Sequence, residues 1–79
     1  MKSVENIGTL IGTSIREYRK EKSLTQPQLA KMIGVSNAAI SFWENGINIP
    51  NVMVCRLIAD ALEISLDELV GRDWNDPVT

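Results

Sequence analysis

The stretch that decides the fold of this chain is TQPQLAKMIGVSNAAISFWENG, which occupies residues 25–46. Its apolar side chains fall at the spacing that places residues on one face of a helix. They are Leu29, Ile33, Val35, Ile40 and Trp43. Gly34 interrupts the pattern and suits the left-handed backbone that ends a helix. The stretch therefore predicts two short helices joined by a tight turn, with the small residue Ala30 where the helices cross.

The ends of both helices carry capping signals. Thr25 and Gln28 have the spacing of a capping box, in which each side chain binds the backbone N–H of the other residue. Ser36 is a suitable N-cap for the second helix, and Asn45 with Gly46 predicts its end. A link as short as residues 34–36 forces a large angle between the two helices.

The flanking sequence predicts three more helices and no strand. One covers about residues 10–22, with Ile7 either inside it or packed ahead of it, and its glycine at position 12 weakens it slightly. Another covers about residues 52–62, and a short one opens at a second capping box on Ser65 and stops at Gly71. The side chains predicted to face inward from these helices are Leu10, Ile11, Ile15, Tyr18, Val54, Leu57, Ile58, Ala61, Leu62, Leu66, Leu69 and Val70.

Length and composition indicate one small all-α domain. The chain has 79 residues, of which 44% are hydrophobic, enough for a single core. We expect residues 1–71 to form this domain and residues 72–79 to be a loose tail, apart from Trp74. There is no histidine and one cysteine, Cys55, so we expect no zinc site, no disulfide and no cofactor. Cys55 is interpreted as a small residue of the core or its boundary rather than a reactive thiol.

We expect a cytoplasmic protein. A single cysteine suits a reducing compartment. No apolar run approaches the roughly 20 residues that span a bilayer, so no membrane association is predicted. The first residues, MKSVENIGTL, lack the apolar stretch of a signal peptide.

The charge is divided unevenly along the chain. The net charge is −2, whereas nucleic-acid-binding domains are usually basic. Residues 1–50 hold six basic and four acidic side chains, and residues 51–79 hold two basic and six acidic ones. This asymmetry favours a less negative surface toward an anionic partner. The alternative is that the acidic residues only keep the second half soluble.

The second helix of the pair leaves small and polar side chains on its outer face. If its apolar residues point inward, the residues that point outward are Ser36, Asn37, Ala38, Ser41, Phe42 and Asn45. Such a surface fits the major groove of DNA, where Asn pairs with adenine and Ala contacts a thymine methyl group. We expect base contacts from Ser36, Asn37, Ala38, Ser41 and Phe42.

Phe42 is the one phenylalanine of the chain, and two interpretations of it stay open. In the first it contacts a thymine methyl group or a partner surface. In the second the helical phase is slightly different and the ring packs at the edge of the core, because an exposed apolar residue alone means little.

Contacts to the DNA backbone are expected around the rim of this face. The N-terminus of the first helix, with its free N–H groups and positive dipole end, attracts phosphate. The expected backbone-contacting residues are Gln26, Gln28, Lys31, Asn45, Asn48 and Asn51, and Arg16 is a weaker candidate. Ordinary capping is the alternative role of Gln28 and Asn51.

Two longer runs, REYRKEKSLTQPQLAKMIGVSNAAISFWENG and PNVMVCRLIADALEISLDELVG, resemble the Xre/Cro family of helix-turn-helix regulators, which includes lambdoid phage repressors. The resemblance covers about residues 10–71. It implies a compact five-helix repressor-like domain whose second and third helices form the helix-turn-helix. It also implies a structural ion pair between Arg19 and Glu44. The DNA contacts that it implies are at Gln26, Asn37, Ala38, Ser41, Phe42 and Asn45.

The resemblance further implies a homodimer on a palindromic double-stranded DNA operator. Several phage repressors carry a glutamine where this chain has Phe42, so their operator sequence is not transferable. The dimer contact is expected either from the last helix with Trp74, or only when two copies meet on DNA. A separate C-terminal dimerisation domain is not expected.

The predicted function is a sequence-specific transcriptional regulator, namely a repressor that reads an operator. A DNA-binding antitoxin uses the same chemistry. A protein-interaction module is the alternative that the acidic pI of about 4.9 and an outward Phe42 favour. An enzyme is not expected, because the sequence has no histidine and no paired acids in a catalytic motif.

Overall fold

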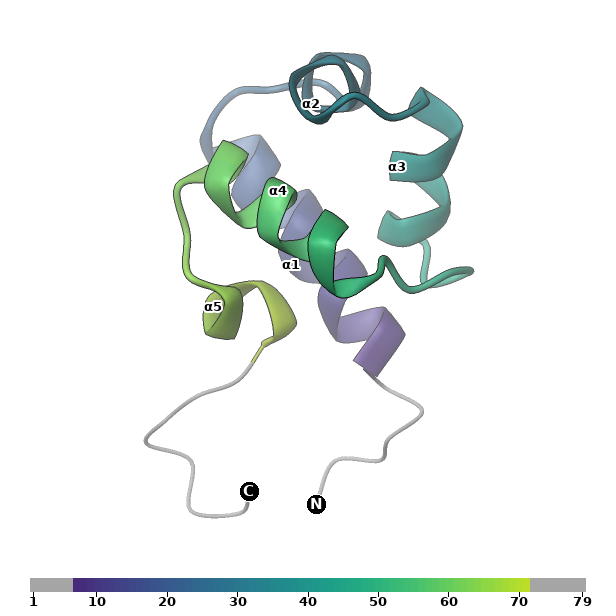
Figure 1. The fold of residues 1–79 in the computed structure, drawn as a ribbon, viewed down its shortest axis with the longest axis vertical. Helices are drawn as coiled ribbons and strands as arrows, with labels where there is room; N and C mark the ends of the chain where they lie inside the picture. Colours follow the sequence, from purple (N-terminus) through teal and green to yellow (C-terminus); the bar gives the residue numbers. More distant parts are fainter. Residues whose placement is uncertain (1–6, 72–79) are drawn as a thin grey trace.

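The computed structural model describes residues 7–71, which fold into five α-helices with no strand in that range (Figure 1). The helices are α1 (Ile7–Glu21), α2 (Gln26–Ile33), α3 (Asn37–Glu44), α4 (Val52–Leu62) and α5 (Leu66–Val70). The all-α prediction and the bounds of α4 are confirmed. The first helix was expected over about residues 10–22, with Ile7 either inside it or ahead of it, and α1 includes Ile7.

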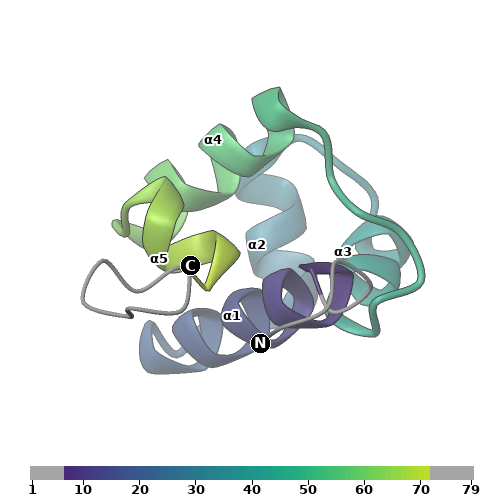
Figure 2. The same cartoon turned by 90° about the horizontal axis from the view of Figure 1, so that it is seen from below.

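α4 passes in front of α1 in Figure 1, and the view from below in Figure 2 shows these two helices on opposite faces of the molecule. In that second view, α5 lies at the left of the molecule and α3 at the right. α1 packs against both α3 and α5, and α2 packs against α3 and α4. The two helices of the predicted helix-turn-helix therefore lie together on one side, and α5 closes the other.

The turn between α2 and α3 forms as its sequence predicts. The Thr25 hydroxyl accepts a hydrogen bond from Gln28 N at 3.2 Å, and Gln28 Oε1 accepts one from Thr25 N at 2.7 Å. Gly34 has φ +77°, in the left-handed region where glycine has no steric penalty. The Ser36 hydroxyl accepts from Ala39 N and starts α3. These local bonds set the angle at which α3 leaves α2.

One core holds the helices together, and each of the five contributes to it. Its fully buried large side chains are Ile15, Leu29, Ile40, Ile58, Leu62 and Leu69. Ala30, predicted at the crossing of α2 and α3, is buried as well. Trp43, Val35 and Ile33 are half-buried and pack against this core. The apolar residues that were predicted to face inward from the helix-turn-helix therefore do so.

Two residues that were predicted to face inward do not. Leu57 is 41% exposed because the buried stripe of α4 runs through Cys55, Ile58, Ala59 and Leu62, and Leu57 lies beside it. Leu66 is 45% exposed because it is the first residue of α5, where side chains lean past the N-terminal end of the helix. Both predictions assigned too wide an apolar stripe to their helix.

α1 and α3 approach each other most closely at Gly12. A methyl group built on Gly12 would lie 2.3 Å from the carbonyl oxygen of Trp43 and 2.8 Å from that of Glu44. Both are backbone atoms, which cannot rotate away. The glycine that weakens α1 therefore allows the end of α3 to lie directly on it.

The predicted loose tail at residues 72–79, with Trp74, lies outside the described residues. Within residues 7–71, none of the helices has the length and apolar character needed to cross a membrane.

Candidate nucleic-acid interface

The outer face of α3 carries the side chains predicted to contact bases. Asn37 and Ala38 are exposed in its first turn, together with the N-cap Ser36. Ser41 is partly buried, and Phe42 is 45% exposed. The neighbouring Trp43 turns toward the core. Phe42 therefore lies outside the core, and the helical phase that placed it outward is confirmed.

The side chains around this face already make bonds within the protein. Gln28 closes the capping box of α2, and Asn51 Oδ1 accepts from Val54 N at 2.9 Å as the N-cap of α4. Asn45 Nδ2 donates to the carbonyl oxygen of Ser41 at 2.9 Å. Lys31 and Asn48 are exposed. The capping roles foreseen for Gln28 and Asn51 are present, and the exposed side chains still surround α3.

A buried ion pair joins α1 to the end of α3. Arg19 Nε donates to Glu44 Oε2 at 2.6 Å, and Arg19 Nη2 donates to Glu44 Oε1 at 3.0 Å. The remaining Arg19 nitrogen, Nη1, donates to the Leu24 carbonyl oxygen at 2.8 Å. This two-pronged contact between planar groups fixes both distance and orientation. It is the pair that the family resemblance implied.

Two more side chains converge on Glu44. Gln26 Nε2, at the start of α2, donates to Glu44 Oε1 at 3.0 Å. Arg16 Nη2 donates to the Glu44 carbonyl oxygen at 3.2 Å and to Asn45 Oδ1 at 3.3 Å. Glu44 therefore ties together α1, α2 and α3. Within residues 7–71, every buried side-chain nitrogen or oxygen has a hydrogen-bond partner.

The electrostatics of this cluster favour the charged pair. Burial alone would raise the pKa of Glu44, but hydrogen bonds from Arg19 and Gln26 and the Arg19 charge outweigh it, so the pKa is lowered. The hydrogen bond to Glu44 raises the pKa of Arg19 despite its burial. Glu44 is therefore ionised at neutral pH.

The Gln26 and Arg16 bonds to Glu44 were not foreseen from the sequence. Gln26 was assigned to the DNA backbone. One N–H of its amide binds Glu44, which leaves the second N–H for another acceptor. The close approach at Gly12 was also missed. The available signal was Gly8 and Gly12, four residues apart in a helix whose neighbouring Ile11 and Ile15 face inward.

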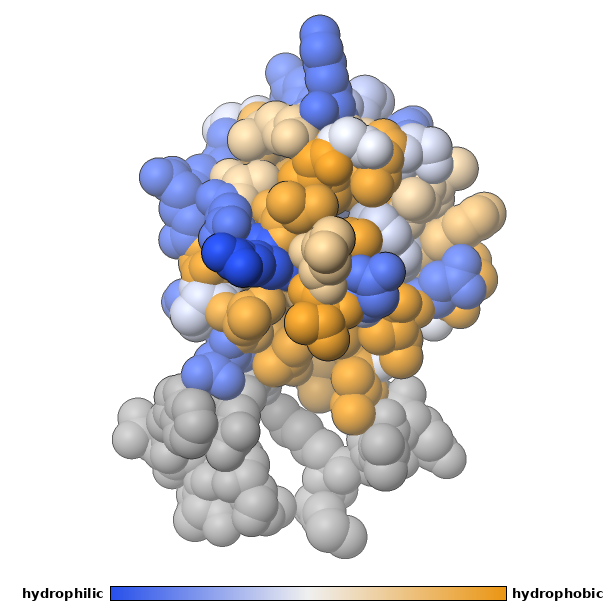
Figure 3. All heavy atoms as spheres, in the orientation of Figure 1, coloured by the Kyte–Doolittle hydropathy of each residue, from blue (hydrophilic) through white to orange (hydrophobic). Residues whose placement is uncertain are grey.

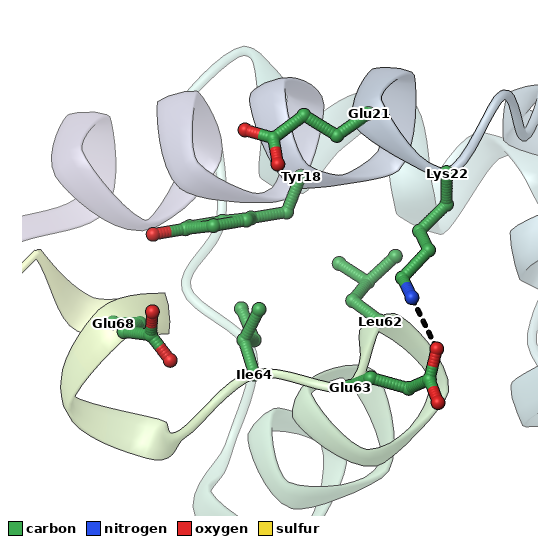
Figure 4. Close-up of a pocket in the computed structure, with 7 residues that line it drawn as sticks. All are labelled: Tyr18, Glu21, Lys22, Leu62, Glu63, Ile64 and Glu68. Carbon is green, nitrogen blue, oxygen red and sulfur yellow. Dashed lines mark hydrogen bonds and ion pairs between the residues drawn. The ribbon is translucent and has the colours of Figure 1, made fainter.

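A hollow of about 360 Å³ lies on the opposite side, between α1, the end of α4 and α5 (Figure 4). Tyr18 lies over Ile64 there, and Lys22 pairs with Glu63 at its edge. Burial and the carboxylates of Glu68 and Glu21 raise the pKa of Tyr18. None of the residues predicted to contact DNA lines this hollow.

The described residues contain no cluster of three or more His, Cys, Asp or Glu side chains that could hold a metal ion. Cys55 is buried, as predicted, and its Sγ donates to the Pro50 carbonyl oxygen at 3.5 Å. Burial raises the pKa of its thiol, so the thiolate is disfavoured.

The exposed face of α3, the crossing with α2 and the buried tie to α1 are the parts of a helix-turn-helix domain. Residues 15–69 match the helix-turn-helix family HTH_3, and the chain belongs to this family. The resemblance to Xre/Cro regulators is therefore confirmed, as is the five-helix repressor-like fold.

Three named relatives illustrate the similarity. Repressor protein C2 of Salmonella phage P22 is 42% identical over 64 residues, which cover 81% of this chain and 30% of that protein. The cryptic phage CTXphi transcriptional repressor RstR of Vibrio cholerae is 46% identical over 73% of this chain and 52% of its own length. Antitoxin PezA of Streptococcus pneumoniae is 31% identical over 81% of this chain and 40% of its own length.

The similarity extends to solved structures. The crystal structure of the P22 c2 repressor with the synthetic operator 9T superposes with a TM-score of 0.76 at 42% identity. The match covers 81% of this chain and 97% of that chain. The first curated relatives are longer proteins, and this chain spans only 29% to 52% of their length.

Proposed function

We propose that this protein is a sequence-specific regulator of transcription that binds double-stranded DNA, and that it acts as a repressor. The observation that carries the proposal is the outer face of α3, whose exposed side chains are uncharged and small apart from Phe42. An α-helix with such a face fits the major groove. Occupation of an operator by the domain excludes polymerase from the same DNA.

The base-contacting residues in this proposal are Ser36, Asn37, Ala38, Ser41 and Phe42. Asn37 is suited to pair with adenine through two hydrogen bonds, which is worth roughly 1–3 kcal/mol of discrimination. Ala38 and the Phe42 ring offer apolar contact to thymine methyl groups. The exposure of Asn37, Ala38 and Phe42 supports these roles.

The backbone-contacting residues are Gln26, Gln28, Lys31, Asn45, Asn48 and Asn51. Gln26 donates one amide N–H to Glu44 and has a second for a phosphate oxygen at the N-terminus of α2. Lys31 is the one cation of this group, so most of the contacts are neutral hydrogen bonds. We therefore expect a weaker salt dependence than that of a strongly basic domain.

The wider proposal is a cytoplasmic, non-enzymatic protein that binds a palindromic operator as a homodimer, without a cofactor. Residues 1–71 form the DNA-binding unit. Two half-sites one helical turn apart, about 34 Å, suit a two-fold symmetric dimer.

Selection of bound sites from random double-stranded DNA tests the proposal. We expect one enriched motif with two inverted halves. Titration of that site with salt should then lower log K in proportion to log salt, with a slope of about −0.9 per phosphate neutralised. Recovery of no motif at low salt would overturn the proposal.

A second candidate is a DNA-binding antitoxin, which the 31% identity to PezA favours. It predicts the same operator binding together with a tight complex with a toxin. A protein-interaction module, the third possibility, is favoured by the acidic pI of about 4.9 and the exposed Phe42 ring. Binding of a defined DNA motif excludes a pure interaction module.

A further inference from the structure

The hollow between α1, the end of α4 and α5 combines apolar walls with a negatively charged rim. Leu62 is buried and Ile64 is partly buried, and the ring of Tyr18 lies over Ile64 (Figure 4). Glu21 comes from α1 and Glu68 from α5, and both are exposed. Such a hollow is suited to a long side chain that has an apolar stem and a cationic head.

One edge of the hollow is already neutralised by a cation of this chain. The ammonium group of Lys22 forms an ion pair with Glu63 there (Figure 4). The other two carboxylates differ, since within residues 7–71 neither Glu21 nor Glu68 is paired with a basic side chain. The Glu68 side chain accepts a hydrogen bond from the backbone N–H of Ser65. The rim therefore keeps two negative charges that no cation of the described chain neutralises.

These negative charges act on Tyr18. Burial first, and then the carboxylates of Glu68, Glu21 and Glu17, raise the pKa of its hydroxyl. The same potential that disfavours a phenolate favours a cation in the same place. Hydrophilic side chains also gather along the side of the molecule where α4 ends and the chain continues to α5 (Figure 3). The hollow thus lies on a surface that attracts basic groups.

We propose that this hollow is the docking site for a basic segment of a second protein, which inserts one arginine side chain. The guanidinium group lies between Glu21 and Glu68, and its aliphatic stem lies against Tyr18 and Ile64. Arginine suits the site because its planar head offers several N–H groups, so two carboxylates can accept from it at once.

The size and exposure of the hollow favour a protein segment over a free small cation. Its volume of about 360 Å³ lies near the lower end of ordinary ligand sites, which have about 300–1,000 Å³. The rim carboxylates are exposed, and exposed ion pairs are individually weak. A small cation therefore gains little here, whereas a protein segment adds contacts between its neighbouring residues and the rim.

The docking site leaves the surface assigned to DNA open. None of the residues assigned to DNA lines the hollow, and α5 and α3 lie at opposite ends of the view in Figure 2. The second protein can therefore bind whether or not α3 is occupied. The proposal does not depend on DNA binding, so its test uses the free protein, and failure of the proposed operator binding would leave that test unaffected.

A titration with two matched peptides tests the proposal on the full chain. The probe is acetyl-Leu-Arg-Leu-amide, and the control has citrulline in place of arginine, which keeps the shape and removes the charge. Heteronuclear NMR at low salt follows the backbone amides while millimolar peptide is added. We expect saturable shifts around Tyr18, Ile64 and Glu68 with the arginine peptide, and binding of the citrulline peptide that is weaker by about five-fold or more.

Two double variants with the same net charge show whether the hollow is the site. Glu21→Gln with Glu68→Gln neutralises the rim, and glutamine at position 68 still completes the capping box with Ser65. Glu17→Gln with Asp60→Asn removes two exposed carboxylates that do not line the hollow. We expect the first variant to bind the arginine peptide about ten-fold more weakly and the second to change less than about two-fold. Circular dichroism checks that both fold.

The proposal fails in any of three ways. Shifts that do not saturate, or that lie away from the hollow, would show that it holds no such site. Equal affinity for the citrulline peptide, or equal losses in the two double variants, would show that the rim charges are not used. Propylguanidine, which has the cationic head without a peptide, is the last probe. If it binds as tightly as the arginine peptide, the site takes a small cation and not a protein segment.

Discussion

The two sides of α3 use opposite chemistry. The side that faces α1 is buried, carries the ionised Glu44 and lies against Gly12, where even a methyl group would collide with backbone. The outer side exposes Asn37, Ala38 and Phe42, which make few bonds within the domain. One short helix therefore has a structural role on one side and a binding role on the other. Its inner side fixes position, and its outer side is free to recognise a ligand.

The largest effect is expected from Arg19→Ala. Glu44 then keeps its burial but loses both hydrogen bonds from Arg19, which should cost about 3–5 kcal/mol of unfolding free energy. A domain of this size has a total stability of about the same amount, so the variant should be largely unfolded. Chemical denaturation followed by circular dichroism measures the loss.

The control for Arg19→Ala is Lys22→Ala, which breaks the exposed ion pair with Glu63. Exposed pairs contribute little to stability, because solvent screens the two charges. If both variants lost the same unfolding free energy, the buried Arg19–Glu44 pair would stabilise the fold no more than an exposed pair.

Gly12→Ala is expected to have the next largest effect. The new methyl group would lie 2.3 Å from the Trp43 carbonyl oxygen, so α1 and α3 must separate, at a cost of at least about 2 kcal/mol. Gly8→Ala is the matched control. Its methyl group would meet the movable Ile49 side chain at 3.3 Å and improves helix propensity. Thermal unfolding should therefore show a lower Tm for the first variant and an equal or higher Tm for the second.

Low pH should weaken the contact between α1 and the inner side of α3, because that contact depends on the charge of Glu44. The pKa of Glu44 is lowered in the folded state, so its contribution to stability is present at neutral pH. This contribution is lost as the pH falls below about 4.3, the ordinary value for glutamate, and through the folded-state pKa. In Glu44→Gln, the unfolding free energy should fall less than in the original protein as the pH drops below about 5.

Glu63→Gln is the control for the acid experiment. The Lys22 contact also lowers the pKa of Glu63, but that side chain is exposed and solvent screens the pair. A flatter pH profile in Glu63→Gln than in Glu44→Gln would contradict the assignment of acid sensitivity to the α1–α3 contact.

The smallest effect on stability is expected from the outer side. Asn37→Ala and Phe42→Ala should each change Tm little while lowering affinity for the selected DNA site by about ten-fold or more. Isothermal titration and thermal unfolding on the same samples separate the two outcomes. A large drop in Tm for Phe42→Ala would show that the ring supports the fold, and the contrast between the two sides of α3 would fail.

Local signals predicted most of the fold. The Thr25–Gln28 capping box, the left-handed Gly34 and the Ser36 N-cap act within a few residues, so their outcome depends little on the rest of the chain. The outward position of Phe42 followed from the same helical spacing. The errors at Leu57 and Leu66 arose because spacing predicts the direction of a buried stripe better than its width.

Contacts between helices that are distant in the sequence were harder to predict. The bond from Gln26 to Glu44 and the clearance at Gly12 depend on the angle and depth at which three helices meet. Side-chain periodicity contains no such information. The Arg19–Glu44 pair was anticipated through family resemblance, because the distance between two side chains cannot be read from their spacing across two helices.

The environment of Cys55 makes this chain convenient for labelling chemistry. Its thiol is buried, donates to Pro50 and has a raised pKa, so it should react slowly with maleimides or spin-label reagents at neutral pH. A new cysteine at Lys20 or Asp60, both exposed and outside the residues assigned to DNA, is then the preferred site of attachment without removal of the native one. Probe-to-probe distances across a complex become measurable in an otherwise unaltered protein.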